Sequence, residues 1–176
     1  MSRDILFDHG NARFSYRISA IPVHEGRVLL QCPVGTNEYA FIGGHVAFGE
    51  TARDTLLREI REELHADAVI GDLIAVGEVY IDWGFCPDGS PRHCHQIGLY
   101  FMTAVDVQQL PPGDTFFGWD EAGNARYHLQ YQWVPLKELH SLTVYPPEVA
   151  RHILSGHGDV LHFTYTELPE ETRWPD

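Results

Sequence analysis

The chain of 176 residues contains no long apolar run and no apolar segment near its first residue. A membrane-spanning helix needs about 18 or more apolar residues in a row, and a secretory signal needs an apolar core. We therefore expect a soluble, cytoplasmic protein that contacts no membrane. Hydrophobic residues make up 44% and charged residues 21% of the chain, a globular composition that suits one domain at this length.

Positive charge is also scarce. Twelve Lys and Arg residues stand against 25 Asp and Glu residues, which gives a net charge of −13. Proteins that bind nucleic acids usually carry a basic face, so we expect no nucleic-acid partner. A phosphate-bearing small molecule remains compatible with an acidic site when divalent cations lie between the two. A homodimer is left open.

Cysteine is sparse and odd in number, which indicates a reducing compartment rather than a disulfide framework. One short segment holds four side chains that can bind metals, Cys86, His93, Cys94 and His95. A structural zinc site usually has two closely spaced ligand pairs, and only one end of this segment is dense. We favour a hairpin with its turn at residues 87–91 and these side chains on its arms.

The order of strands and helices predicts an α/β fold of the α+β type in a single domain. Hydrophobic periodicity predicts strands at residues 13–23, 27–31, 39–42, 73–85, 96–105, 128–134 and 160–166. Helices are predicted at residues 51–65, 136–140 and 147–154. The first helix begins at a capping box formed by Thr51 and Asp54.

Three segments are predicted to lie outside this regular pattern. Residues 106–126 are polar and rich in glycine and proline, so we expect a long loop there. We divide the chain into a lead-in at residues 1–12, a domain at residues 13–167 and an acidic tail at residues 168–176, which we expect to be loose.

The first predicted helix combines an apolar stripe with a group of carboxylates. The stripe has helical spacing and consists of Leu56, Leu57, Ile60 and Leu64. Glu59, Glu62 and Glu63 lie at positions i, i+3 and i+4, so their carboxylates converge on a neighbouring face. Such a group of hard oxygen ligands suits Mg²⁺ or Mn²⁺. Taken alone, the helix fits a solvated glutamate-rich surface equally well.

The spacing around this helix resembles the signature of the Nudix family. Gly44, five residues, Glu50, seven residues and then Arg-Glu-Ile-Arg-Glu-Glu at residues 58–63 reproduce its fixed positions. Residues 27–31 and 133–139 are also similar to family segments, so the resemblance covers most of residues 14–165. The family's helix-ending glycine is replaced by His65, a residue type that tolerates the left-handed conformation. Ala66, Ile42 and Gln132 depart from the family pattern as well.

The resemblance implies a mixed β-sheet sandwiched between helices and a pyrophosphohydrolase that cleaves a nucleoside diphosphate linked to another moiety. It also implies Mg²⁺ or Mn²⁺ as cofactor, a small nucleotide or nucleotide-sugar type molecule as partner, and roles for several residues. The catalytic residues would be Glu59, Glu62, Glu63 and Arg58. The metal ligands would be Glu59, Glu62 and Glu63, with the Gly44 carbonyl as a further ligand. Arg58 would pair with a carboxylate, for which Glu50 is the supporting candidate.

Two roles stay open at this point. The general base is either a glutamate of the helix or an acid of the predicted long loop, Asp114, Asp120 or Glu121. Arg17 is a candidate for substrate binding, but an exposed position on the first strand is the interpretation we favour for it. Several aromatic residues are candidates for stacking on a base, and we select none of them: Trp83, Phe85, Phe116, Phe117 and Trp119.

Two other functions compete with hydrolysis. A Nudix domain that binds or senses a nucleotide without turnover is one, although such members usually lack glutamates that this chain keeps. Isomerisation of isoprenyl diphosphates is the other, and it needs a catalytic cysteine in a context that none of the three cysteines has. Signatures for coenzyme A, ADP-ribose and dinucleoside polyphosphate substrates are missing, so the substrate stays open.

Overall fold

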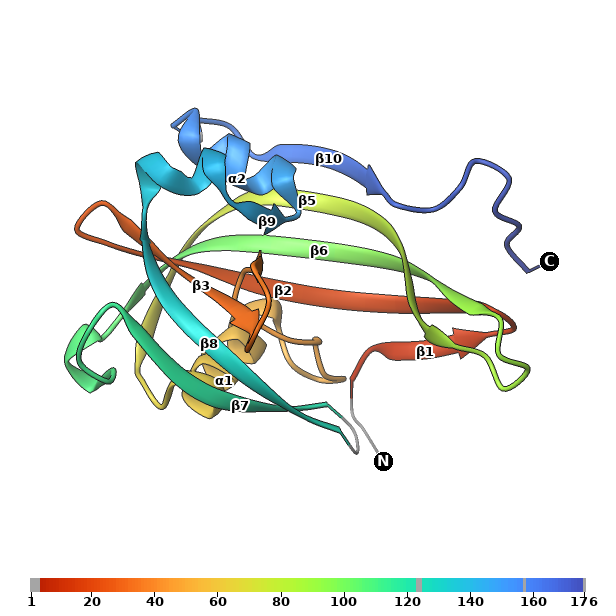
Figure 1. The fold of residues 1–176 in the computed structure, drawn as a ribbon, viewed down its shortest axis with the longest axis horizontal. Coiled ribbons are helices and arrows are strands. Elements are labelled where there is room, and N and C mark those ends of the chain that lie inside the picture. The colour runs from red at the N-terminus through yellow and green to blue at the C-terminus, as the bar shows by residue number, and fades with distance from the viewer. Residues whose placement is uncertain (1–3, 123–124, 157, 176) are drawn as a thin grey trace.

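The structure is a computed structural model and describes residues 4–122, 125–156 and 158–175 (Figure 1). Its strands are β1 (Leu6–His9), β2 (Ala12–His24), β3 (Arg27–Pro33), β4 (Glu38–Ala40), β5 (Ala68–Phe85), β6 (Pro91–Val105), β7 (Thr115–Ala122), β8 (Ala125–Pro135), β9 (Thr143–Tyr145) and β10 (Leu161–Thr166). Its helices are α1 (Ala52–Leu64) and α2 (Pro147–Leu154), and its 3₁₀ turns are η1 (Val107–Gln109) and η2 (Leu136–Ser141). In the described ranges, neither helix is long and apolar enough to cross a membrane.

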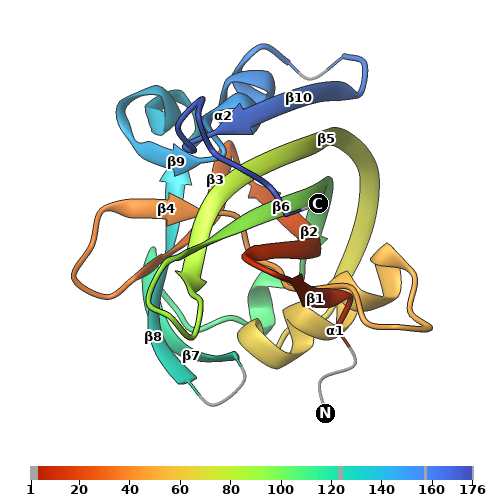
Figure 2. The same ribbon diagram turned by 90° about the vertical axis from the view of Figure 1, so that its right-hand side faces the viewer.

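The strands form one connected, strongly curved sheet in the order β10-β5-β6-β2-β3-β4-β9. β1 pairs with β2, and β8 pairs with both β3 and β7. The long hairpin β5–β6 is antiparallel, whereas β10 runs parallel to β5 and β2 runs parallel to β6. Figure 2 shows β10, β5, β6 and β2 as one half of the sheet, and β3, β4, β8 and β7 as the other.

Strand β2 divides two hydrophobic cores because its side chains alternate between the faces of the sheet. Ile18 and Ala20 point into a core shared with α1, and Ile21 points into a core shared with α2 and η2. Figure 1 shows α1 below and α2 above the long strands. The predicted mixed sheet between helices is therefore confirmed.

Helix α1 begins and ends as its sequence predicts. The Asp54 amide donates to Thr51 Oγ1 at 3.2 Å, and the Thr51 amide donates to the Asp54 carboxylate at 3.1 Å, which completes the capping box. Leu56, Ile60 and Leu64 are buried, and each such side chain stabilises the fold by about 1.5–3 kcal/mol. His65 ends the helix in the left-handed conformation, with φ of 55°. These features hold α1 firmly on the sheet.

The long loop predicted at residues 106–126 is wrong. η1 and the whole of β7 lie within it, and β7 pairs with β8 as a hairpin. On one face of β7, Phe116 packs on Tyr131, but the next two positions on that face are Gly118 and Asp120. The strand therefore lacks the apolar alternation by which strands are recognised. β1 and β9, at four and three residues, are too short for such a signal and were also missed.

The acidic tail is also more ordered than predicted. The Trp174 ring contacts the rings of Tyr80, His93 and His95, with centroids 5.9–6.4 Å apart. Asn11 donates a hydrogen bond to the Arg173 carbonyl. The described part of the tail therefore packs across the outer face of β5 and β6, because its tryptophan finds an aromatic surface there.

We expect His65→Gly to stabilise the protein. A residue with a side chain in the left-handed conformation destabilises the folded state by about 1–2 kcal/mol, and glycine avoids this cost. Glycine also raises the entropy of the unfolded chain, which offsets about 0.4–1 kcal/mol of the gain. The free energy of unfolding in urea should therefore rise by about 0.5–1 kcal/mol. His65→Ala keeps the strain and serves as the control. Equal stability of the two variants would contradict this account of the helix end.

Candidate active site

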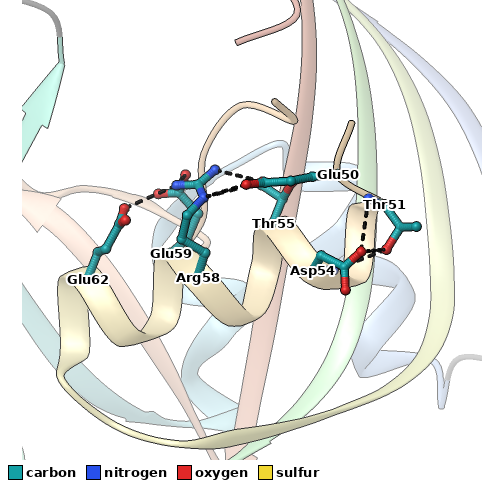
Figure 3. A network of polar contacts seen from close by, with 7 residues as sticks. All are labelled: Glu50, Thr51, Asp54, Thr55, Arg58, Glu59 and Glu62. Carbon is teal, nitrogen blue, oxygen red and sulfur yellow. Dashed lines mark hydrogen bonds and ion pairs between the residues drawn. The ribbon is translucent and has the colours of Figure 1, made fainter. Parts of the chain in front are cut away.

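Arg58 lies between carboxylates from α1 and from the loop before it (Figure 3). Its Nη2 contacts Glu50 at 3.2 Å, and its Nη1 contacts Glu59 at 2.8 Å and Glu62 at 3.1 Å. Partial burial disfavours the charge of Arg58, but the hydrogen bonds and negative charges of Glu50 and Glu59 outweigh it and raise the pKa of Arg58. The Thr55 hydroxyl donates to Glu50 at 2.7 Å. Arg58 thus fixes the positions of three carboxylates, Glu50 among them as expected.

Glu63 is the most buried acid of the helix, with 8% of its surface exposed. The Tyr131 hydroxyl donates to its Oε2 at 3.2 Å. Burial raises the pKa of Glu63 to about 8, and the negative charges of Asp120 and Glu59 add to this effect. Asp120 belongs to β7, so the β7–β8 hairpin brings a further carboxylate to face α1.

Glu59 lies against the backbone of Gly44. A Cβ atom at Gly44 would stand 2.4 Å from the Glu59 carboxylate, so any side chain at this position would displace that carboxylate. The Gly44 carbonyl accepts a hydrogen bond from the Ile18 amide at 3.0 Å, and a carbonyl oxygen has a second lone pair. Burial raises the pKa of Glu59, although the charge of Arg58 opposes the shift.

Arg17 extends from β2 toward the same carboxylates. Its Nη2 donates to the Gly43 carbonyl at 2.9 Å, and its positive charge favours the ionised forms of Glu59 and Glu63. His45 stacks on Trp83 with ring centroids 5.4 Å apart. Burial, with a contribution from the charge of Arg17, lowers the pKa of His45 to about 4. His45 is therefore neutral at neutral pH, and the positive charge near it comes from Arg17 and Arg13.

Two cavities open beside these residues. The first, of about 790 Å³, lies between α1 and the β7–β8 hairpin, and its polar lining includes Arg58, Glu59, Glu62, Glu63 and Asp120. The second, of about 490 Å³, is lined in part by Arg17, Trp83, Gln96, Tyr100, Tyr145 and Tyr165. Arg17 lines the second cavity while its charge acts on Glu59 and Glu63 in the first, so it connects the two electrostatically.

A model of the NUDIX domain matches residues 15–154 of the chain. The chain belongs to the Nudix family. A CTP pyrophosphohydrolase from Escherichia coli (strain K12) is 37% identical over 62 residues, which amount to 33% of this chain and 46% of that protein. The similarity thus spans about half the length of this curated relative.

Solved Nudix structures share the fold. A Nudix hydrolase from Nitrosomonas europaea superposes with a TM-score of 0.56 at 17% identity, over 87% of this chain and 79% of that one. An ADP-ribose pyrophosphatase from Streptococcus suis superposes with a TM-score of 0.53 at 12% identity, over 87% of this chain and 98% of that one. At such identities the likeness concerns the fold alone.

The donor set on the Nudix helix fits a divalent cation of the Mg²⁺ type. Its donors are all carboxylate oxygens, and burial, together with the negative charges of Asp120 and Glu59, raises the pKa of Glu63, so a nearby cation would favour its ionised form. Among the residues that the structure describes, no three acidic, histidine or cysteine side chains converge as a ready coordination sphere. Arg58 explains this arrangement, since it holds Glu59 and Glu62 by ion pairs.

The geometry separates the acids that the sequence left as alternatives. Asp114 pairs with Arg27 and lines neither cavity, whereas Asp120 faces Glu63. The side chain of Glu121 lies outside the described part of the structure. Arg17 is partly buried and lines a cavity, so the favoured interpretation of an exposed strand residue is wrong.

Sequence reasoning missed several residues beside these cavities. Tyr131 was not singled out, although its place between Leu129 and Trp133 on a strand predicts an inward side chain, and an inward hydroxyl needs a partner. Glu38, Tyr165 and Glu167, which line the second cavity, come from β4 and from β10 and its end, and no local pattern joins them.

The cysteines and histidines of the β5–β6 hairpin do not gather into a metal site in the described residues. The hairpin interpretation is confirmed, because residues 86–90 form the turn between these strands. His93 pairs with Asp82 at 2.7 Å, and Cys94 is fully buried. Neither cavity is lined by a cysteine, which disfavours cysteine-dependent isomerase chemistry.

We expect the metal-free protein to lose stability as the pH rises from about 5 to about 8. The pKa of Glu63 is about 8 in the folded protein against an ordinary value of 4.5, so the folded state favours the protonated form. This contribution is complete below pH 4.5 and is lost as the pH passes through 8. Relative to Glu63→Gln, the wild type should lose on the order of 2–4 kcal/mol across this range, at about 1.4 kcal/mol per pKa unit.

Urea unfolding with EDTA present, at several pH values, measures this difference. Glu62→Gln is the matched control, because the Glu62 side chain is 60% exposed and its removal should leave the pH dependence of the wild type. Parallel stability curves for the wild type and Glu63→Gln would contradict the assignment of Glu63 as a buried, crowded carboxylate.

Proposed function

We propose that this Nudix protein is a Mg²⁺- or Mn²⁺-dependent hydrolase that cleaves a phosphoanhydride bond in a nucleoside diphosphate derivative or nucleoside triphosphate. The observation that carries the proposal is the meeting of Glu59, Glu63 and Asp120 at one cavity, with Arg17 leading to a second cavity of nucleoside size. The similar protein from Escherichia coli supports it, since that protein is a CTP pyrophosphohydrolase.

Glu59, Glu62 and Glu63 are the residues that would hold the cation, with the free lone pair of the Gly44 carbonyl as a further donor. A bound divalent cation supplies Lewis-acid neutralisation of the charge on phosphate oxygens. Arg58 positions Glu59 and Glu62 by its ion pairs and so orients these carboxylates.

Arg17 binds a phosphate oxygen in this proposal. Its Nη2 is engaged by the Gly43 carbonyl, and the other N–H groups of its guanidinium remain as donors. Such charge-assisted hydrogen bonds are the strong ones and fix the phosphate chain relative to α1.

Asp120 serves as the general base. It faces Glu63 from β7 and lines the first cavity, whereas Glu63 is buried and accepts the hydrogen bond of Tyr131. Water attacks one phosphorus, the bond from that phosphorus to the bridging oxygen breaks, and Asp120 receives the proton of the water.

A panel of nucleoside diphosphate conjugates and nucleoside triphosphates, incubated with Mg²⁺ or Mn²⁺, tests the enzyme. We expect at least one phosphoanhydride to be cleaved, with two phosphorylated fragments identified by mass. Glu59→Gln and Glu63→Gln should each lower kcat/KM by at least about a hundredfold, because charge stabilisation in the transition state is lost. Glu170→Gln, on the tail outside both cavities, is the control. Nucleotide binding without any turnover would favour the sensing module instead.

Asp120→Asn tests the general base separately. The amide keeps the size of the side chain but cannot accept the proton, so kcat should fall by about 10²–10⁴ while KM changes little. Asp114→Asn is the matched control, since Asp114 lies just before the same strand and pairs with Arg27. Equal kcat values for the two variants would remove Asp120 from the mechanism.

A further inference from the structure

The order of the strands places the two ends of the second cavity at different strands. Tyr165 of β10 pairs with Val79 of β5, which pairs with Gln96 of β6, which in turn pairs with Ser15 of β2. Three strand spacings of about 4.8 Å therefore separate Tyr165 from β2, which carries Arg17. The cavity thus has a cationic end at β2 and a distant end at β10.

Acidic and aromatic side chains mark the far end. Glu167 follows β10 and lines the cavity. Glu38 of β4 also lines it, and β4 is linked to this end through β9, because Ala40 pairs with Tyr145, whose ring contacts Tyr165 of β10. The rings of Tyr145 and Tyr165 lie there with centroids 6.3 Å apart. Carboxylates repel phosphates, so a bound nucleotide places its phosphates at Arg17 and its base toward Glu38 and Glu167, where aromatic rings offer stacking surfaces.

The carboxylates at this end offer only acceptors. The Tyr165 hydroxyl donates to Glu167 Oε1 at 2.5 Å, which holds this carboxylate in place and leaves its Oε2 for a ligand. In the described structure no hydrogen bond or ion pair engages the Glu38 carboxylate. Gln96 also lines the cavity, but its amide can present either a donor or an acceptor and does not discriminate.

We propose that this cavity selects nucleotides whose base carries an exocyclic amino group, with the carboxylates of Glu38 and Glu167 accepting hydrogen bonds from that group. The proposal rests on the proposed function for the place of the phosphates. An oxo group at the same position of the base is an acceptor, as the carboxylates are, so these hydrogen bonds could not form. Loss of hydrogen bonds to charged groups corresponds to a preference of about ten- to hundredfold.

Two pairs of nucleotides isolate the amino group. CTP and UTP differ in an amino against an oxo group at one position of the pyrimidine, and ATP and ITP differ in the same way on the purine. Each pair shares its ribose and phosphates, so contacts to the sugar cancel in the ratio. With the full chain and Mg²⁺, we expect kcat/KM to favour the amino member of at least one pair by about ten- to hundredfold.

Variants then assign the preference to the carboxylates. Glu38→Gln and Glu167→Gln replace an acceptor-only group by an amide, so each should reduce the ratio, and the double variant should bring it close to one. Tyr165→Phe removes the donor that holds Glu167 and should reduce the ratio less than Glu167→Gln does. Glu170→Gln should keep the ratio of the wild type.

The outcomes separate this proposal from the proposed function. Turnover with equal kcat/KM within both pairs, or a preference that survives in the double variant, overturns the selection by Glu38 and Glu167 and leaves the hydrolase intact. If no nucleotide is hydrolysed, the proposed function fails. Calorimetric titration with the same four nucleotides then still tests whether the cavity selects the amino group. A tenfold tighter Kd for an amino member supports selection, and equal affinities or no binding overturns it.

Discussion

Helix α1 has to bury a carboxylate on the face that packs it into the core. Glu63 lies beside Leu64 and one turn from Ile60, and all three are buried. An ionised carboxylate in such a place is costly unless hydrogen bonds or positive charges compensate it. Tyr131 donates one hydrogen bond and Arg17 contributes a positive charge, yet the pKa of Glu63 stays near 8. The fold therefore holds a carboxyl group at a point where either a proton or a bound cation has to compensate its charge.

The loop before α1 links the helix and its carboxylates to β2 at the centre of the sheet. Hydrogen bonds join it to β2 at three places, from Ile18 to Gly44, from Ala20 to Ile42 and from Val46 to Tyr16, at 2.7–3.0 Å. The strand that separates the two cores thus also fixes the backbone against which Glu59 lies. A side chain on Gly44 would push this carboxylate aside.

Local patterns predicted the parts of the molecule that depend on local physics. The capping box at Thr51, the stripe of Leu56 and Ile60, and the left-handed end at His65 all follow from residues within one helix. Strand β7 could not be predicted, because its inward face carries Gly118 and Asp120 in place of apolar residues. The role of this face depends on its position opposite α1, which no local pattern shows. The second cavity could not be predicted for the same reason, since its walls come from both halves of the sheet and meet only in the folded chain.

The partners of the arginines that line the cavities indicate where an acidic protein of this kind can bind a phosphate chain. Arg58 is held by three carboxylates, and Arg126 stacks on Trp119 at 4.5 Å. Of the arginines that line the two cavities in the described structure, Arg17 makes one hydrogen bond, to a backbone carbonyl. With a net charge of −13, the protein attracts divalent cations and repels free phosphate chains. In the proposed function, a phosphate chain therefore gains most where Arg17 and a cation held by α1 act on it together, so it would lie between these two groups.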